Sequence, residues 1–149
     1  MQTVKRQRGR FPAAKIETGD VGTVRQRYYF ATDNGMLIWD VDSMLKAIES
    51  HPGDFELRLV DTDVVARENQ EAMVNETYAM ETDLNKPCVL AEVGDGHYLL
   101  LDGNHRLRKA LRQKLSCMIC YCLKEEQHQK YIEHYRPKEY ERVMHGKKY

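Results

Sequence analysis

The order of hydrophobic and polar positions along the chain predicts short strands and helices in mixed order. The clearest unit spans residues 98–123, where an apolar run over residues 98–101 indicates a buried strand and residues 102–104 form a sharp polar turn. A helix follows in which four apolar residues recur at the spacing of one helical face: Leu107, Ala110, Leu111 and Leu115. A second apolar strand over residues 117–123 closes this strand, turn, helix and strand unit.

The remaining segments predict two hairpins and several helices. Asn34-Gly35 is typical of a tight hairpin turn, and Asp42 or Ser43 is the expected cap of the helix that follows. The predicted elements, in chain order, are a strand over 21–31, its return over 36–39, a helix ending near 51–53, a strand over 55–60, a surface helix over about 64–78, a loop over 82–87, a strand over 88–93, a turn over 94–96, and, after the central unit, a helix over 124–135 and a short helical piece running from Pro137 toward Met144.

This pattern predicts an α+β fold in a single domain of 149 residues. Its expected parts are a basic arm over residues 1–10, an N-terminal hairpin and helix extension over 11–54, a core over 55–123 and C-terminal helices over 124–149. The extension would act as a lid or platform. Trp39 and the neighbouring tyrosines are expected in the core, and stacking on a base is the alternative for them.

Charge is balanced over the whole chain but not along it. Residues 1–28 carry seven Lys or Arg against two Asp or Glu (net +5), residues 29–103 carry four against sixteen (−12), and residues 104–149 carry twelve against five (+7). The basic ends could pair with the acidic middle within the fold. Alternatively, they form a basic surface for a nucleotide or a nucleic acid.

Membrane and secretory classes are not indicated. No apolar run approaches the roughly 18–20 residues of a membrane span, and the basic N-terminus lacks an apolar segment after it. The four cysteines are then expected as free thiols in a reducing cytoplasm. We therefore expect a cytoplasmic protein without a membrane partner.

The turn into the central helix is the strongest candidate site. The first N–H groups of a helix lack intrahelical partners and lie at the positive end of its dipole, so they bind anions. His105 and Arg106 would oppose the dipole in that first turn, which favours a bound anion such as phosphate. The alternative is that Asp102 caps the helix and the basic residues are solvated.

This turn resembles the ParB/sulfiredoxin superfamily. ParB-like proteins carry Gly-Glu-Arg-Arg-x-Arg-Ala at the start of the helix, and here Gly103, Arg106 and Arg108 agree with it in register, while Ala110 lies one position after the motif's alanine. Sulfiredoxins carry Gly-Gly-Cys-His-Arg, which Gly103, His105 and Arg106 match in register. Pro87 before the strand over 88–93 resembles the family's entry strand. The resemblance covers roughly residues 55–123 and implies a small mixed β-sheet flanked by helices.

The resemblance also implies a nucleotide site. Family members hold the phosphates of ATP or CTP at this turn, so Gly103, Asn104, His105 and Arg106 are the expected contacts, with Arg108 as a weaker candidate. Asn104 replaces the reactive cysteine of sulfiredoxins, which excludes their sulfur chemistry. His105 replaces an arginine of ParB-like proteins, so a preference for CTP is not implied. The 26 residues after the core leave no room for a helix-turn-helix domain.

Hydrolysis or phosphoryl transfer would assign Asp102 and His105 as catalytic residues, with Asp102 as a metal ligand or general base. Asp102 and Asp83, joined by Asp61, could hold Mg²⁺ beside the phosphates, although solvated carboxylates are the simpler alternative. Cys117, Cys120 and Cys122 have partly metal-like spacing. In a strand, however, Cys120 and Cys122 share one face and Cys117 points to the other, which favours buried structural thiols.

Two other functions remain open at this stage. A DNA-binding or DNA-cleaving ParB-like nuclease would contact DNA through the basic arm and the helix over residues 105–114. A non-catalytic interaction module of plasmid or phage type would keep the fold without chemistry. The sequence does not fix the oligomeric state.

Overall fold

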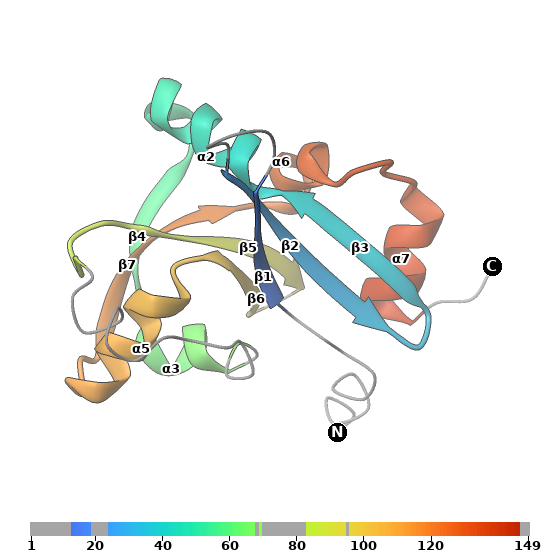
Figure 1. Cartoon of the computed structure of the whole chain (residues 1–149). Helices are drawn as coiled ribbons and strands as arrows, with labels where there is room; N and C mark the ends of the chain where they lie inside the picture. The colour runs from blue at the N-terminus through green and yellow to red at the C-terminus, as the bar shows by residue number, and fades with distance from the viewer. Residues whose placement is uncertain (1–12, 19–23, 68, 70–82, 95, 147–149) are drawn as a thin grey trace.

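The computed structural model describes residues 13–18, 24–67, 69, 83–94 and 96–146. Its strands form two sheets (Figure 1). The N-terminal sheet is antiparallel and contains β1 (Ala13–Thr18), β2 (Val24–Thr32) and β3 (Gly35–Asp40) in that order. The central sheet has the order β4-β7-β5-β6 and contains β4 (Glu56–Asp61), β5 (Cys88–Gly94), β6 (His97–Asp102) and β7 (Cys117–Leu123).

The central sheet is mixed, as the sequence predicts. β4 and β6 pair antiparallel with their neighbours, whereas β5 and β7 are parallel. The helical elements are short: α2 (Val41–Ser50), η1 (Pro52–Asp54), α3 (Thr62–Ala66), α5 (Asn104–Arg112), α6 (Glu125–His128), η2 (Gln129–Tyr131) and α7 (Pro137–His145). This arrangement confirms the α+β class.

The two faces of the central sheet are covered by different parts of the chain. Along β5, Leu90 belongs to a core that includes Val65 of α3 and Leu107 of α5. Its neighbour Ala91 points the other way, into a core that includes Trp39 of β3. In Figure 1, α3 and α5 lie together at the lower left, and the N-terminal sheet and α7 occupy the right.

The N-terminal extension is therefore half of the core rather than a lid. Tyr28, Phe30 and Trp39 are buried against the strands of the central sheet, which confirms Trp39 as a core residue. The sequence also missed β1, which pairs with β2 and widens this sheet. The expected basic arm over residues 1–10 lies outside the described residues.

Several predicted boundaries need correction. The cap of α2 is Asp40, whose carboxylate accepts a hydrogen bond from the N–H of Ser43 at 3.1 Å, instead of Asp42 or Ser43. The helix expected over 64–78 begins earlier, as α3 at Thr62, and α3 ends at Ala66. Residue 68 and residues 70–78 of that prediction lie outside the described part.

The hydrophobic face predicted for α5 is only half right. Leu107 and Ala110 are buried, but Leu111 and Leu115 are 38% and 39% exposed. The helix ends at Arg112, and Lys114 beyond it has a positive φ of 55°, so Leu115 lies outside the helical face. The third buried residue of α5 is Arg106, only 8% exposed.

Among the described residues, no helix is long and apolar enough to cross a lipid bilayer.

Candidate functional site

The turn between β6 and α5 is shaped by Gly103. Its φ of +125° is one that side-chain-bearing residues rarely adopt. A Cβ atom there would lie 2.5 Å from the sulfur of Cys88 and 2.9 Å from its Cβ. Gly103 therefore lets the start of α5 pack directly on β5, closer than any other residue would allow.

Asp102, the last residue of β6, ties this turn to the N-terminal sheet. Its Oδ1 accepts a hydrogen bond of 3.0 Å from Nε2 of Gln26 on β2. Its Oδ2 accepts one of 2.9 Å from Nη2 of Arg106, which also forms an ion pair with it. Both carboxylate oxygens are thus engaged before any ligand or metal arrives.

Arg106 is buried, and is not solvated as the alternative to an anion site required. Its side chain folds back beneath the turn toward Asp102 and Cys88, and its Nε is buried with no hydrogen-bond partner among the residues that the structure describes. Burial works against the charged guanidinium, but the neighbouring Cys88 and Asp102 outweigh it and raise the pKa of Arg106. A fixed positive charge therefore sits just below the helix N-terminus.

Cys88 is a member of this cluster that the sequence analysis missed. The parallel register places it beside Cys120 of β7, and both thiols are buried. The pKa of Cys88 is lowered by its hydrogen bond with Cys120 and by the charge of Arg106. No local motif marks this residue, because the pairing joins strands about thirty positions apart.

The N-terminus of α5 is open in a way that suits an anion. No side chain caps it, and its first turn contains no acidic residue. The first backbone bond of the helix, from the Leu107 N–H to the Gly103 carbonyl at 2.9 Å, leaves the preceding N–H groups outside the helical ladder. Asn104 and His105, both half-buried, carry the side chains nearest to these groups.

His105 favours its neutral form. Burial lowers its pKa, and the charge of Arg106 lowers it further, although Asp102 partly opposes both effects. A neutral imidazole can donate one N–H to a ligand oxygen without adding charge to the site. Arg108, the weaker candidate, lies farther along the same helix and is also half-buried.

The expected metal ligands are not assembled with the turn. Among the described residues, which include Asp61, Asp83 and Asp102, no group of three or more His, Cys, Asp or Glu side chains could hold a metal ion. Asp83 accepts a hydrogen bond of 2.9 Å from the Asn85 N–H in the loop before β5. Asp61 ends β4, where it lies 3.8 Å from the sulfur of Cys117.

The strand cysteines of β7 follow the predicted alternation. Cys120 and Cys122 are buried on the face covered by α3 and α5, and Cys117 is exposed. Cys122 accepts a hydrogen bond of 3.3 Å from Nε of Arg58. These contacts confirm that Cys120 and Cys122 share one face.

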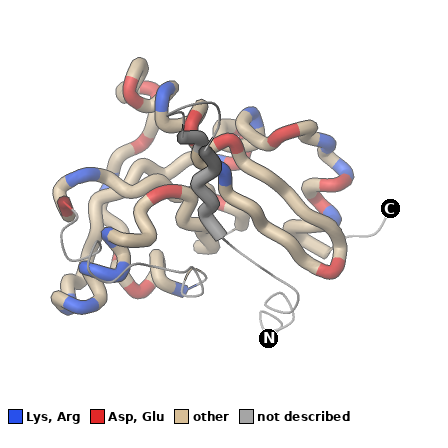
Figure 2. Tube along the Cα trace, viewed as in Figure 1, with Lys and Arg blue, Asp and Glu red and all other residues tan. Residues whose placement is uncertain are grey.

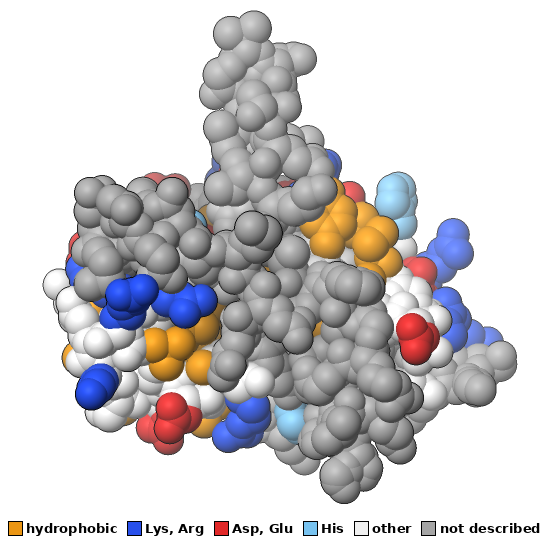
Figure 3. All heavy atoms as spheres, turned by 60° about the horizontal axis from the view of Figure 1, so that its bottom comes forward, with side chains coloured by type: hydrophobic (Ala, Val, Ile, Leu, Met, Phe, Trp, Pro, Cys, Tyr) orange, Lys and Arg blue, Asp and Glu red, His pale blue; other side chains and the backbone are white. Residues whose placement is uncertain are grey.

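Basic residues gather along α5 and just after it. Figure 2 shows Lys and Arg positions along this helix at the lower left, and Arg112 and Lys114 are exposed. Figure 3 brings the lower side of the molecule forward and shows Lys and Arg side chains beside a hydrophobic patch at its left. The site at the turn therefore adjoins a basic surface.

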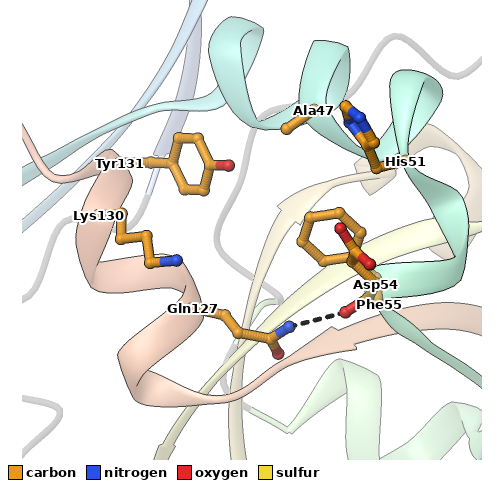
Figure 4. Close-up of a pocket in the computed structure, with 7 residues that line it drawn as sticks. All are labelled: Ala47, His51, Asp54, Phe55, Gln127, Lys130 and Tyr131. Carbon is orange, nitrogen blue, oxygen red and sulfur yellow. Dashed lines mark hydrogen bonds between the residues drawn. The ribbon is translucent and has the colours of Figure 1, made fainter.

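A second concavity lies elsewhere in the molecule, between the α2–η1 segment and the α6–η2 segment (Figure 4). It has a volume of about 230 Å³ and is lined by Ala47, His51, Asp54, Phe55, Gln127, Lys130 and Tyr131. One hydrogen bond of 3.0 Å crosses it, from Nε2 of Gln127 to the carbonyl of Asp54. Its rim mixes positive and negative groups, and the sequence analysis selected none of them.

Comparison of the chain with family models, curated proteins and solved structures found no match. The geometry of the site is therefore the basis for the function proposed below.

Proposed function

We propose that the N-terminal end of α5 binds the phosphates of a nucleoside triphosphate such as ATP or CTP. The phosphate contacts are the backbone N–H groups at the start of α5 and the side chains of Asn104 and His105. Arg106 contributes its charge from beneath the turn, since its guanidinium is buried against Asp102. This differs from the direct Arg106–phosphate contact expected from the sequence.

One observation supports this proposal above the others: an uncapped helix N-terminus lies over a buried arginine with an unpartnered Nε. Uncapped N–H groups and the helix dipole favour a negative ligand. A buried guanidinium strengthens that preference, because the protein interior screens its charge less than water does. A bound anion would accept hydrogen bonds from the open N–H groups and be attracted by the charge of Arg106 without contacting its Nε.

The proposal covers binding rather than hydrolysis. Asp102, the candidate general base and metal ligand, already accepts hydrogen bonds on both oxygens from Gln26 and Arg106. Mg²⁺ would reach the site with the nucleotide, as it commonly does for phosphate ligands. Catalysis by Asp102 and His105 stays a prediction from the sequence.

Asn104→Asp tests the proposal, because it should change the free and the bound protein in opposite directions. A carboxylate in the first turn of α5 should stabilise the free helix by about 0.5 kcal/mol through the dipole, and it should repel phosphate. We therefore expect a slightly higher melting temperature without ligand. We also expect the loss of any shift caused by ATP, CTP, GTP or inorganic triphosphate with Mg²⁺.

The wild-type protein should be stabilised by about 2.7 kcal/mol at a hundredfold the dissociation constant of its ligand. Gln113→Glu adds the same charge at the other end of α5, where the side chain is exposed, and should leave that shift in place. Inorganic triphosphate separates recognition of phosphate from recognition of the base. An unshifted wild type with every ligand would refute the proposal.

A second candidate, binding to DNA, is favoured by the exposed basic residues at the end of α5. Arg112 and Lys114 would contact the phosphate backbone, and the affinity would fall steeply with salt. Retention on duplex DNA that is lost between low and high salt, with no response to nucleotides, would favour this function. A protein that responds to neither would instead fit the interaction module.

A further inference from the structure

The outer strand β4 exposes an apolar stripe on the central sheet. Leu57 and Leu59 are 46% and 69% exposed, although the sheet beside them is well packed. They stand opposite Tyr121 and Ile119 of β7, so these four side chains share one face. Large apolar side chains grouped on a sheet edge typically mark an interaction surface.

Among the described strands, none pairs with the outer side of β4. The Thr62 N–H donates to the Ser116 carbonyl at 2.9 Å, and this pair directly follows the last pair of the β4–β7 register. It therefore shows which residues of β4 form hydrogen-bonded pairs with β7. Hydrogen-bonded and non-hydrogen-bonded pairs alternate in an antiparallel ladder. It follows that Glu56 and Arg58 bond to β7, whereas the N–H and C=O groups of Leu57 and Leu59 point away from the sheet.

At the opposite edge of the sheet, the backbone of β6 is hydrogen-bonded by the side chain of Asn69. On β6, the Leu100 N–H donates to Oδ1 of Asn69 at 2.8 Å, and the Tyr98 carbonyl accepts from Nδ2 of Asn69 at 3.2 Å. The β5–β6 pairing is also broken by register shifts. By contrast, the β4–β7 register is regular, and β4 contains neither proline nor lysine. Proteins commonly use such features to block edge-to-edge pairing, and β4 lacks them.

We propose that two copies of this chain pair through β4, antiparallel across a two-fold axis, and join their central sheets into one. In an antiparallel pair, two residues that stand opposite each other point to the same face of the joint sheet. Leu57 and Leu59 must therefore stand opposite residues of the second copy that point to the apolar face. Leu57 opposite Leu57 of the second copy is one such register. The two apolar stripes then become continuous.

Charge selects this register from its neighbours. With Leu57 at the axis, Glu56 of each copy lies opposite Arg58 of the other. Within one chain the Arg58 guanidinium donates to the Tyr98 hydroxyl at 2.7 Å and to Sγ of Cys122 at 3.3 Å, so it turns outward to form the two cross-strand pairs. Moving the axis to Arg58 would oppose two arginines, and moving it to Leu59 would place Asp61 against Leu57. Opposite charges facing each other on neighbouring strands stabilise a sheet, and like charges destabilise it. Within one chain the Glu56 carboxylate is 3.9 Å from Nε of Arg58, so both side chains lie on the same face.

The experiment measures mass against concentration by sedimentation for the full chain and charge-reversed variants. We expect a species of twice the 17.5 kDa of one chain. Glu56→Arg should weaken dimerisation by about tenfold or more, because both symmetry-related pairs become repulsive. Arg58→Glu should do the same, and its far-UV circular dichroism and melting curve are compared with those of the wild type because Arg58 also donates to Tyr98 and Cys122 within one chain. The double variant E56R/R58E should recover the dimer, since it restores opposite charges in this register alone.

Two further variants separate dimerisation from folding. Leu59→Glu should abolish the dimer while its far-UV circular dichroism and melting curve stay those of a folded protein, because the side chain is mostly exposed. Met36→Glu is the matched control on β3, where Met36 is 47% exposed, and it should dimerise like wild type. A wild-type monomer at every concentration would overturn the proposal. A dimer that survives Leu59→Glu, or a double variant that stays monomeric, would do so as well.

Discussion

Two of the buried polar side chains in this protein have surroundings that differ in a useful way. His128 is fully buried, and both of its ring nitrogens are engaged: Nδ1 accepts from Nε1 of Trp39 at 3.2 Å, and Nε2 lies 2.8 Å from the Glu92 carbonyl. Arg106 is almost as buried but keeps an unpartnered Nε. A buried polar group with all partners present is typical of a structural role.

The cluster of Arg106 and Asp102, in which the Arg106 Nε has no partner, is a better candidate for function than the fully hydrogen-bonded His128 cluster. An unsatisfied buried donor is unfavourable in the free protein, and its presence beside the N-terminus of α5 supports the proposal that a ligand binds there. His128 instead joins three parts of the fold, since Trp39 belongs to β3, Glu92 to β5 and His128 itself to α6. No local pattern in the sequence marks this difference between His128 and Arg106.

Removal of His128, whose two ring nitrogens are both hydrogen-bonded, should have the largest effect on stability. His128→Leu leaves the buried Trp39 N–H without an acceptor, so we expect the protein to lose about 2–3 kcal/mol of unfolding free energy. Urea unfolding followed by tryptophan fluorescence measures it. His51→Leu, at an exposed position, is the control and should change stability by less than about 0.5 kcal/mol. Equal losses of unfolding free energy in His128→Leu and His51→Leu would contradict a structural role for the His128 hydrogen bonds.

Removal of the ion pair between Asp102 and Arg106 should change stability much less. In the double variant D102N/R106M, the amide introduced at position 102 can still accept from Gln26, and the methionine replaces the guanidinium by apolar volume. Replacing a buried ion pair by apolar groups is often neutral or stabilising, so we expect unfolding free energy within about 1 kcal/mol of wild type. Nucleotide-dependent stabilisation should disappear. A loss as large as that of His128→Leu would assign Asp102 and Arg106 to the fold alone.

The smallest predicted effect is a dependence of stability on pH. Burial lowers the pKa of His128 below its ordinary 6.5, so the unfolded chain binds a proton that the folded protein resists. The contribution of His128 to the free energy of unfolding should therefore be constant above pH 6.5. It should fall as the pH drops from 6.5 toward the pKa of His128 in the folded protein.

His105 should contribute in the same direction but less, since it is only partly buried. His128→Gln should flatten this part of the pH profile more than His105→Gln does. Equal slopes in the wild type and His128→Gln would contradict the assignment of the neutral His128 to the folded state.

Local pattern predicted much of the fold. The hairpin at Asn34-Gly35, the strand–turn–helix unit around Gly103 and the strand over 117–123 depend on nearby residues, and all three are present. What failed depends on contacts across the chain. The N-terminal sheet covers the central sheet because Tyr28 and Trp39 meet β5 and β6, which no local signal specifies.

The same reasoning explains the outcome at the candidate site. Sequence located the turn, because a glycine between a strand and a basic helix is a local feature. The inward direction of Arg106 follows from Asp102 four residues earlier and from Cys88 on another strand. Only the parallel pairing of β5 and β7 brings Cys88 and Cys120 together, and pairing partners are not encoded in either strand alone.

The position of β7 has a consequence for how the chain folds. β7 follows the other three strands of the central sheet along the chain, yet it lies between β4 and β5, which do not pair with each other directly. Until Cys117–Leu123 emerges from the ribosome, β4 has no partner in its sheet and the β5–β6 hairpin stands apart from it. Because the Glu56–Cys122 pairing spans so much of the chain, closing it has a high entropic barrier. The central sheet should therefore form late and in one cooperative step.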